Sequence, residues 1–223
     1  MPNRAPDLVW DEPAPDDGAL TRTTIVRAAI EIADRDGLDA VSIRRVAAKL
    51  GARPMSLYTH IASKDDLLDL MLNEVVAEAL VPEPLPDAWR EALREIARYS
   101  YRAFVAHPWT LEAFGRGARV GPNVLRHAEQ SAAAVAPLAL EPEDAWRVLG
   151  IVDDYTLGCA VRTATFGQTA VEERFPVVDP GEHPELARMG YPTVMEAPDA
   201  FEIGLETVLD GVERRFRVSP SSA

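Results

Sequence analysis

The segment at residues 42–61, SIRRVAAKLGARPMSLYTHI, constrains the fold more than any other part of the chain. Two short stretches with helical apolar spacing flank a Leu-Gly pair, which predicts two helices joined by a tight turn. Gly51 supplies the turn, and Pro54 falls in the first turn of the second helix, where no backbone N–H is needed. The pattern is typical of a helix-turn-helix, whose second helix enters the DNA major groove.

The distribution of charge supports this interpretation. The chain of 223 residues has a net charge of -13, which argues against a protein that coats nucleic acid over its whole surface. Between Gly18 and Lys64, however, eight Lys or Arg residues stand against four Asp or Glu. A basic module on an acidic body fits a protein that contacts phosphate with one face.

The remaining sequence predicts an all-α protein, because alternating β-branched runs are scarce and Ala, Leu, Arg and Glu dominate. We expect an N-terminal three-helix helix-turn-helix domain followed by a larger C-terminal helical domain. The single Cys159 fits a reducing compartment. With no long apolar run and no apolar signal core at the N-terminus, the expected localisation is cytoplasmic, away from the membrane.

Proline, glycine and capping residues divide the chain. A first helix should follow Thr21 and end at Gly37, and Ser42 and Ser63 should cap two later helices. Three prolines at 82, 84 and 86 mark a domain boundary. The predicted parts are a disordered tail at 1–19, a helix-turn-helix domain at 20–81 and a helical domain at 87–217. Helices are expected at 87–106, 109–116, 122–135, 142–166 and 199–216, with a long loop at 167–198 that holds a short helix near 185–189.

The predicted DNA-contacting residues lie at the leading edge of the reading helix and at its flanks. Arg44 can reach a guanine or a phosphate, and Lys64 begins the next helix, where a phosphate would be favoured. Leu57 and Ile61, four residues apart, should instead point into the core. The full predicted DNA-binding set is Arg44, Arg53, Pro54, Met55, Ser56, Tyr58, Thr59, His60 and Lys64.

Residues 20–72 resemble the DNA-binding domain of the TetR family of transcriptional repressors. The matching elements are Gly37-Leu38, Arg44, Ala47, Leu50-Gly51, Leu57-Tyr58-x-His60 and Lys64-x-x-Leu67-Leu68. The resemblance implies that Arg44 and residues 53–56 read bases, and that Tyr58, His60 and Lys64 bind the phosphate backbone. Thr59 stands where the family often has an aromatic residue.

The C-terminal half shows no clustering of catalytic residues, so we expect no enzyme, no cofactor and no metal site. His107, His127 and His183 lack metal-ligand spacing, and Cys159 is interpreted as a buried structural thiol. A small-molecule enzyme with an incidental pair of N-terminal helices is the alternative. It would need convergent acid–base residues, and the sequence offers no such set.

Two apolar helices, at 142–166 and 199–216, either form an intrachain core or bind a partner. The segments at 155–161 and 201–216 are similar to the dimerisation helices of the tetracycline-repressor branch of the family. This resemblance implies a homodimer with a four-helix interface. The predicted interface residues are Trp146, Leu149, Tyr155, Leu157, Phe201, Leu205, Val208, Leu209 and Val212.

The central helices are expected to enclose a ligand pocket. Its predicted lining is Trp89, Ile96, Ser100, Phe104, Trp109, Phe114, Arg119, Asn123, Asp153, Asp154 and Phe166. The tetracycline-repressor branch has a histidine where Asp154 stands, a glutamate at Arg162, and an asparagine and a phenylalanine at Ile96 and Ser100. Its metal-binding histidine has no match near Gly121, so a metal–tetracycline inducer is not expected.

Together these features predict a ligand-responsive transcriptional repressor. It would bind a palindromic double-stranded DNA operator as a homodimer and be released by a small-molecule inducer of unknown identity. The alternative is a helix-turn-helix activator, or a regulator controlled by a protein partner, since the sequence hardly separates these from a repressor.

Overall fold

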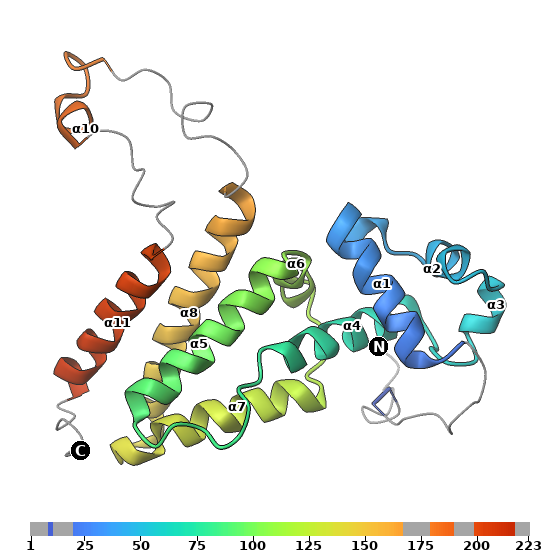
Figure 1. Ribbon diagram of the computed structural model, residues 1–223, viewed down its shortest axis with the longest axis horizontal. Helices are drawn as coiled ribbons and strands as arrows, with labels where there is room; N and C mark the ends of the chain where they lie inside the picture. The colour runs from blue at the N-terminus through green and yellow to red at the C-terminus, as the bar shows by residue number, and fades with distance from the viewer. Residues whose placement is uncertain (1–8, 11–19, 167–178, 190–198, 217–223) are drawn as a thin grey trace.

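The computed structural model describes residues 9–10, 20–166, 179–189 and 199–216, and this part of the chain contains helices and no strand. The predicted all-α fold is confirmed (Figure 1). The N-terminal elements are α1 (Arg22–Asp36), η1 (Leu38–Ala40), α2 (Ile43–Lys49), α3 (Pro54–Leu57) and α4 (Lys64–Glu78). The later elements are α5 (Trp89–Ala106), α6 (Trp109–Gly115), α7 (Pro122–Val135), η2 (Ala136–Leu138), α8 (Pro142–Phe166), α10 (Pro184–Met189) and α11 (Ala200–Phe216).

Local sequence signals set the helix boundaries as predicted. The Thr21 side chain accepts from the backbone N–H of Thr24 at the start of α1, and Gly37 ends that helix with φ of 82°. Ser42 caps α2 and Ser63 caps α4, each by accepting a backbone N–H three residues later. Such caps satisfy backbone donors that the helix itself leaves unpaired.

Two clusters of buried apolar side chains hold the chain together. The first is built from α1 to α4, and it also takes in Ala103, Trp109 and Ala113 from α5 and α6. The second joins α5, α7, α8 and α11. Because α5 contributes to both clusters, the helix-turn-helix unit is packed against the body rather than merely linked to it.

The helix α4 runs from the N-terminal unit toward the body (Figure 1). In the body, α5 packs along α8, and α11 packs on another side of α8. The helix α7 contacts α4, α5 and α8. Any shift of α7 relative to the body therefore bears on the helix that carries the N-terminal unit.

The structure departs from the sequence-based expectations in two ways. The two 3-10 helices, η1 and η2, were not predicted. Val9 and Trp10, within the predicted tail, pack against the first cluster. After α4, the backbone N–H and carbonyl of Val81 bond to the Gln130 side chain at 3.1 and 2.8 Å. The rest of the tail at 1–8 and 11–19, and the loop at 167–178 and 190–198, lie outside the described residues; α10 forms where a short helix was predicted.

Candidate DNA-binding surface and ligand-binding region

The helix-turn-helix is anchored by a few apolar side chains and offers its polar ones to solvent. Leu57 is fully buried and Ile61 is 3% exposed, as predicted. Gly51 has φ of 64°, a left-handed conformation that other residues adopt only with strain. The turn brings α3 across α2, so the reading edge projects from the molecule.

The predicted DNA-contacting residues lie on α2, on α3 and directly on either side of it, and at the start of α4. All except His60, which is half-buried, are exposed. Arg44 and Arg53 form no ion pair with any residue that the structure describes. The hydroxyl of Thr59 donates to the carbonyl of Ser56 at 2.7 Å, which ties the end of the short α3 to its first turn. Two free guanidinium groups beside this edge can therefore reach an anionic partner.

Two neighbouring cations are already engaged with α1. Arg45 pairs with Asp36, and Lys49 pairs with Glu31 at 2.6 Å. The hydrogen bond from Lys49 holds the pKa of the Glu31 carboxyl below its usual value. Arg44, adjacent to Arg45 in sequence, is thus the α2 arginine with its charge available.

A polar pair lies inside the region predicted to bind ligand. The Ser100 hydroxyl on α5 and Nε2 of His127 on α7 are 2.9 Å apart, and Ser100 is 5% exposed. Burial lowers the pKa of the His127 imidazole, which favours its neutral form. A neutral imidazole can donate a hydrogen bond to an uncharged polar group or accept one from it.

Other aromatic and aliphatic residues of the predicted lining lie along α5 and on α6. Phe104 and Phe114 meet edge to face, with ring centroids 6.0 Å apart, and Phe114 is 41% exposed. Trp89 and Ile96 are buried in the second core cluster. The Phe166 side chain lies outside the described residues.

Three other residues of the predicted lining make polar contacts to α1 or α4. Trp109 belongs to the first core cluster, and its Nε1 donates to Asp34 of α1 at 2.7 Å. Arg119, in the loop before α7, and Asn123, in the first turn of α7, bond to α4. Arg119 also lines a small cavity beside Tyr58 and Thr59. The membership of these three residues in a ligand pocket stays a prediction. Their polar groups are taken up by contacts between the body and the N-terminal unit.

The contacts of Arg119 and Asn123 define what we call the α4–α7 junction. Arg119 pairs with Asp66 at 2.5 Å and with Asp69 at 2.6 Å, and both carboxylates are nearly buried. The backbone N–H and side-chain amide of Asn123 both donate to Asn73 at 2.9 Å. These three α4 partners stand three and four residues apart, so they share one helix face. Sequence reasoning missed them, although two acids within an apolar helix were a usable signal.

The two neighbouring acids of α8 differ in their surroundings. Nearby protein atoms raise the pKa of Asp153 to about 6, and the charge of Asp154 adds to the shift, although Asp153 remains accessible to solvent. Asp154 lines a groove of about 750 Å³ between α8 and α11, beside Arg147 and Arg215. Both acids were predicted to line one ligand pocket. In the structure Asp154 lines the groove between α8 and α11.

Five of the nine predicted interface residues are used within the single chain. Their side chains are buried in the second core cluster; they are Leu149, Phe201, Leu205, Leu209 and Val212. Val212 also lines the groove between α8 and α11. Tyr155 donates its hydroxyl to the carbonyl of Phe201 at 2.9 Å. Leu157 and Val208 are partly exposed, and Trp146 is 67% exposed.

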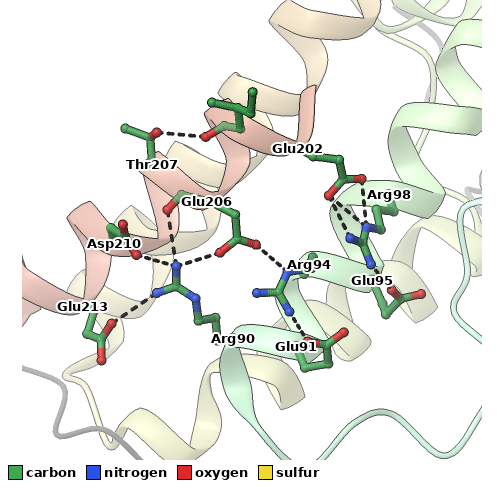
Figure 2. Close-up of polar contacts among 11 residues, drawn as sticks. Arg90, Glu91, Arg94, Glu95, Arg98, Glu202, Glu206, Thr207, Asp210 and Glu213 are labelled. Atoms are coloured by element: carbon green, nitrogen blue, oxygen red, sulfur yellow. Dashed lines mark hydrogen bonds and ion pairs between the residues drawn. The ribbon is translucent and has the colours of Figure 1, made fainter. Parts of the chain in front are cut away.

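A ladder of ion pairs that sequence reasoning missed joins α5 to α11 (Figure 2). Arg90, Arg94 and Arg98 stand one turn apart on α5. They meet acids that run in the opposite order along α11, namely Glu202, Glu206, Asp210 and Glu213. Figure 2 shows Glu206 between Arg90 and Arg94, at 2.8 and 2.5 Å. The repeated i, i+4 spacing in both segments was the available signal.

Within the described ranges, no three His, Cys, Asp or Glu side chains come together in a way that could hold a metal ion. Within the same ranges, no helix combines the length and hydropathy needed to cross a membrane.

Comparison with known proteins places this architecture. Residues 25–71 match the model of the bacterial regulatory proteins of the tetR family, and residues 81–216 match the tetracyclin repressor-like C-terminal domain. The HTH-type transcriptional repressor DrrR1 of Streptomyces coeruleorubidus is 32% identical over 94% of this chain and 85% of its own length. The class A tetracycline repressor protein from transposon 1721 of Escherichia coli is 32% identical over 88% of this chain and 92% of its own.

A solved structure shares the fold over nearly the whole chain. Apo ActR from Streptomyces coelicolor superposes with a TM-score of 0.73 and 27% identity, over 91% of this chain and 99% of ActR. The complex of ActR with actinorhodin superposes with a TM-score of 0.70 and 29% identity, over 86% and 95% of the two chains. The helix-turn-helix surface, the helical body and these matches lead to one conclusion: the chain belongs to the TetR family of DNA-binding transcriptional regulators, which are not enzymes.

Proposed function

We propose that the protein is a ligand-responsive repressor that binds a palindromic operator as a homodimer in the bacterial cytoplasm. The observation that carries the proposal is the free cationic edge of the helix-turn-helix, where Arg44 and Arg53 are exposed and unpaired within the described residues. The similar DrrR1 is a transcriptional repressor, which favours repression over activation. Base contacts from α3 and phosphate contacts from Tyr58, His60 and Lys64 would give affinity and specificity.

The homodimer is supported by the groove between α8 and α11. Its floor has two glycines, Gly150 and Gly211, which allow a second backbone to approach closely, and it carries the exposed Ile151. Asp154 and Arg215 also line it. A two-fold arrangement would set acid against arginine across the interface, so a second copy of the chain is the occupant that fits.

The inducer would bind between α5 and α7 around Ser100 and His127. Actinorhodin is a ligand of the similar ActR, which supports a small-molecule inducer. Phe104 and Phe114 favour an inducer with an apolar or aromatic part, and the neutral His127 would bond to its hydroxyl or carbonyl. Because the residues at Ile96, Ser100, Asp154 and Arg162 are not metal–tetracycline ligands, magnesium–tetracycline is not the proposed inducer.

Release from DNA would follow from movement at the α4–α7 junction. A ligand that displaces α7 acts on α4 through the buried pairs of Arg119 with Asp66 and Asp69. Since α4 directly follows the reading helix, its tilt changes the separation of the two reading helices in a dimer. A coupling of about 1–3 kcal/mol between ligand and DNA is typical of such regulators.

Footprinting of DNA upstream of the protein's own gene tests the proposal. A protected palindrome at physiological salt, together with increased reporter expression when the gene is deleted, is the expected result. Absence of protection contradicts the proposal, and a fall in reporter expression would make the protein an activator. A thermal-shift screen with actinorhodin and with magnesium–tetracycline tests the ligand: actinorhodin-like compounds should raise Tm, and magnesium–tetracycline should not.

A further inference from the structure

The segment before α1 is joined to the helix-turn-helix by one arginine. Nη1 of Arg22 donates to the carbonyl of Val9 at 3.1 Å, and Nε of the same side chain donates to the carbonyl of His60 at 3.3 Å. Val9 also lines a small cavity together with Tyr58 and Thr59, which lie just after α3. The N-terminal segment is thus tied to the part of the molecule that faces DNA.

The next residue, Trp10, reaches the start of α7. A Cβ atom built on Gly121 would lie 2.8 Å from Cη2 of Trp10 and would also overlap the side chain of Asn73. A real Cβ does not come this close to a neighbour, so glycine is required there for the indole to sit as it does. Trp10 therefore packs at the α4–α7 junction, beside the Asn73–Asn123 bonds.

These contacts add a connection between the body and the DNA-binding unit. Others run along α4 and through Trp109, whose Nε1 donates to Asp34 of α1. The added connection runs from His60 through Arg22 and Val9 to Trp10 and Gly121. It meets the body at the start of α7, a point that the Trp109 contact does not reach, so it opposes a shift of the helix-turn-helix relative to α7.

We propose that residues 9 and 10 form a strap that fixes the orientation of the helix-turn-helix relative to α7. On this account residues 9 and 10 are part of the switch, and Trp10 is a positioning residue that does not contact DNA. Its part in induction rests on the proposed function, whereas its mechanical role in the free protein does not.

Hydrogen exchange of the full-length, DNA-free protein tests the strap. Trp10→Ala should raise exchange about fivefold or more in both α4 and residues 119–125, because the packing that closes the junction is lost. Val120→Ala is the matched control, since Val120 is 60% exposed in the loop before α7, and it should leave exchange unchanged.

Unchanged protection of α4 and residues 119–125 in Trp10→Ala would overturn the strap. So would an effect confined to DNA affinity, which would mean that the segment contacts DNA instead. Footprinting of the wild-type protein separates the two proposals. A wild type that protects no DNA contradicts the proposed function, and the exchange result in the free protein still decides the strap.

Discussion

At the scale of single residues, Arg44 and Arg45 are neighbours in sequence with different surroundings. Arg45 is held by Asp36 of α1, whereas Arg44 has no ion-pair partner among the described residues. The sequence identified both as basic residues of one helix. It could not separate them, because the separation depends on where the acids of α1 come to lie after folding.

This difference predicts unequal effects on DNA binding. Arg44→Ala should cost about 1–3 kcal/mol of operator affinity and relax the preference at one base position. Arg45→Ala, as the matched variant, should cost less than about 1 kcal/mol, since an exposed arginine already paired within the protein has less to offer DNA. Fluorescence-anisotropy titrations against single-base operator variants give both quantities. An equal loss on all sequences for Arg44→Ala would make Arg44 a phosphate anchor and not a base-reading residue.

Asp153 predicts a dependence of stability on pH. Its pKa is raised from 3.8 to about 6 in the folded chain, so the folded state binds this proton more tightly than the unfolded state. The resulting stabilisation is present below about pH 4 and is lost as the pH rises through about 6. Asp153→Asn should therefore be more stable than wild type at pH 7, by on the order of 1 kcal/mol after discounting for solvent access. Urea denaturation at pH 4 and pH 7 measures this, and parallel stability curves for the two proteins would contradict it.

At the scale of elements, α11 is held by two kinds of contact on two faces. Its apolar residues pack in the second core cluster, and its acids meet the arginines of α5 (Figure 2). The apolar periodicity and the capping residues predicted nearly every helix in the described part of the chain. The choice between intrachain core and dimer interface could not be made from periodicity, because both need an apolar face.

The ion-pair ladder predicts a stability difference that depends on pH and salt. Hydrogen bonding from Arg94, with a smaller part from Arg90, lowers the pKa of Glu206 to about 2. The stabilisation is present above the ordinary value of 4.5 and is lost as the pH falls toward 2. Glu206→Gln should destabilise the protein by about 1 kcal/mol at pH 7, discounted because Glu206 is partly exposed, and by less in 1 M salt.

Thr207→Ala is the control for this variant. The Thr207 hydroxyl donates within its own helix, to the carbonyl of Ile203 at 2.8 Å, and takes no part in the ladder. Thermal unfolding at low and high salt should separate the two variants. Equal Tm values for Glu206→Gln and wild type at low salt would show that the ladder adds nothing to stability.

At the scale of the whole molecule, the account requires two copies of the chain. The family resemblance predicts a partner interface on α8 and α11, and five of the nine side chains that it names are buried in the core of the single chain. The exposed residues of the groove, such as Ile151, are the side chains that a second copy of the chain would bury. The contacts that join the N-terminal unit to the body were also beyond prediction, since Trp109 and Arg119 could equally have lined a pocket.

The groove predicts that a charge at Ile151 prevents dimerisation. Ile151→Glu would bury an unpaired carboxylate in a symmetric interface and should yield monomers in sedimentation velocity at micromolar concentration. Leu125→Glu on α7 is the matched control, because Leu125 is 63% exposed and lies outside the groove. A dimeric Ile151→Glu protein would place the interface elsewhere.

The central claim is that two copies of the reading surface bind DNA together, and selection from a random duplex library tests it most directly. The wild-type protein should enrich an inverted repeat whose half-sites are centred about 10 bp, or a multiple of one helical turn, apart. Arg44→Ala should lose the preference at one symmetric pair of positions in that repeat. Enrichment of no sequence, or of a single half-site without its inverted partner, would contradict the claim.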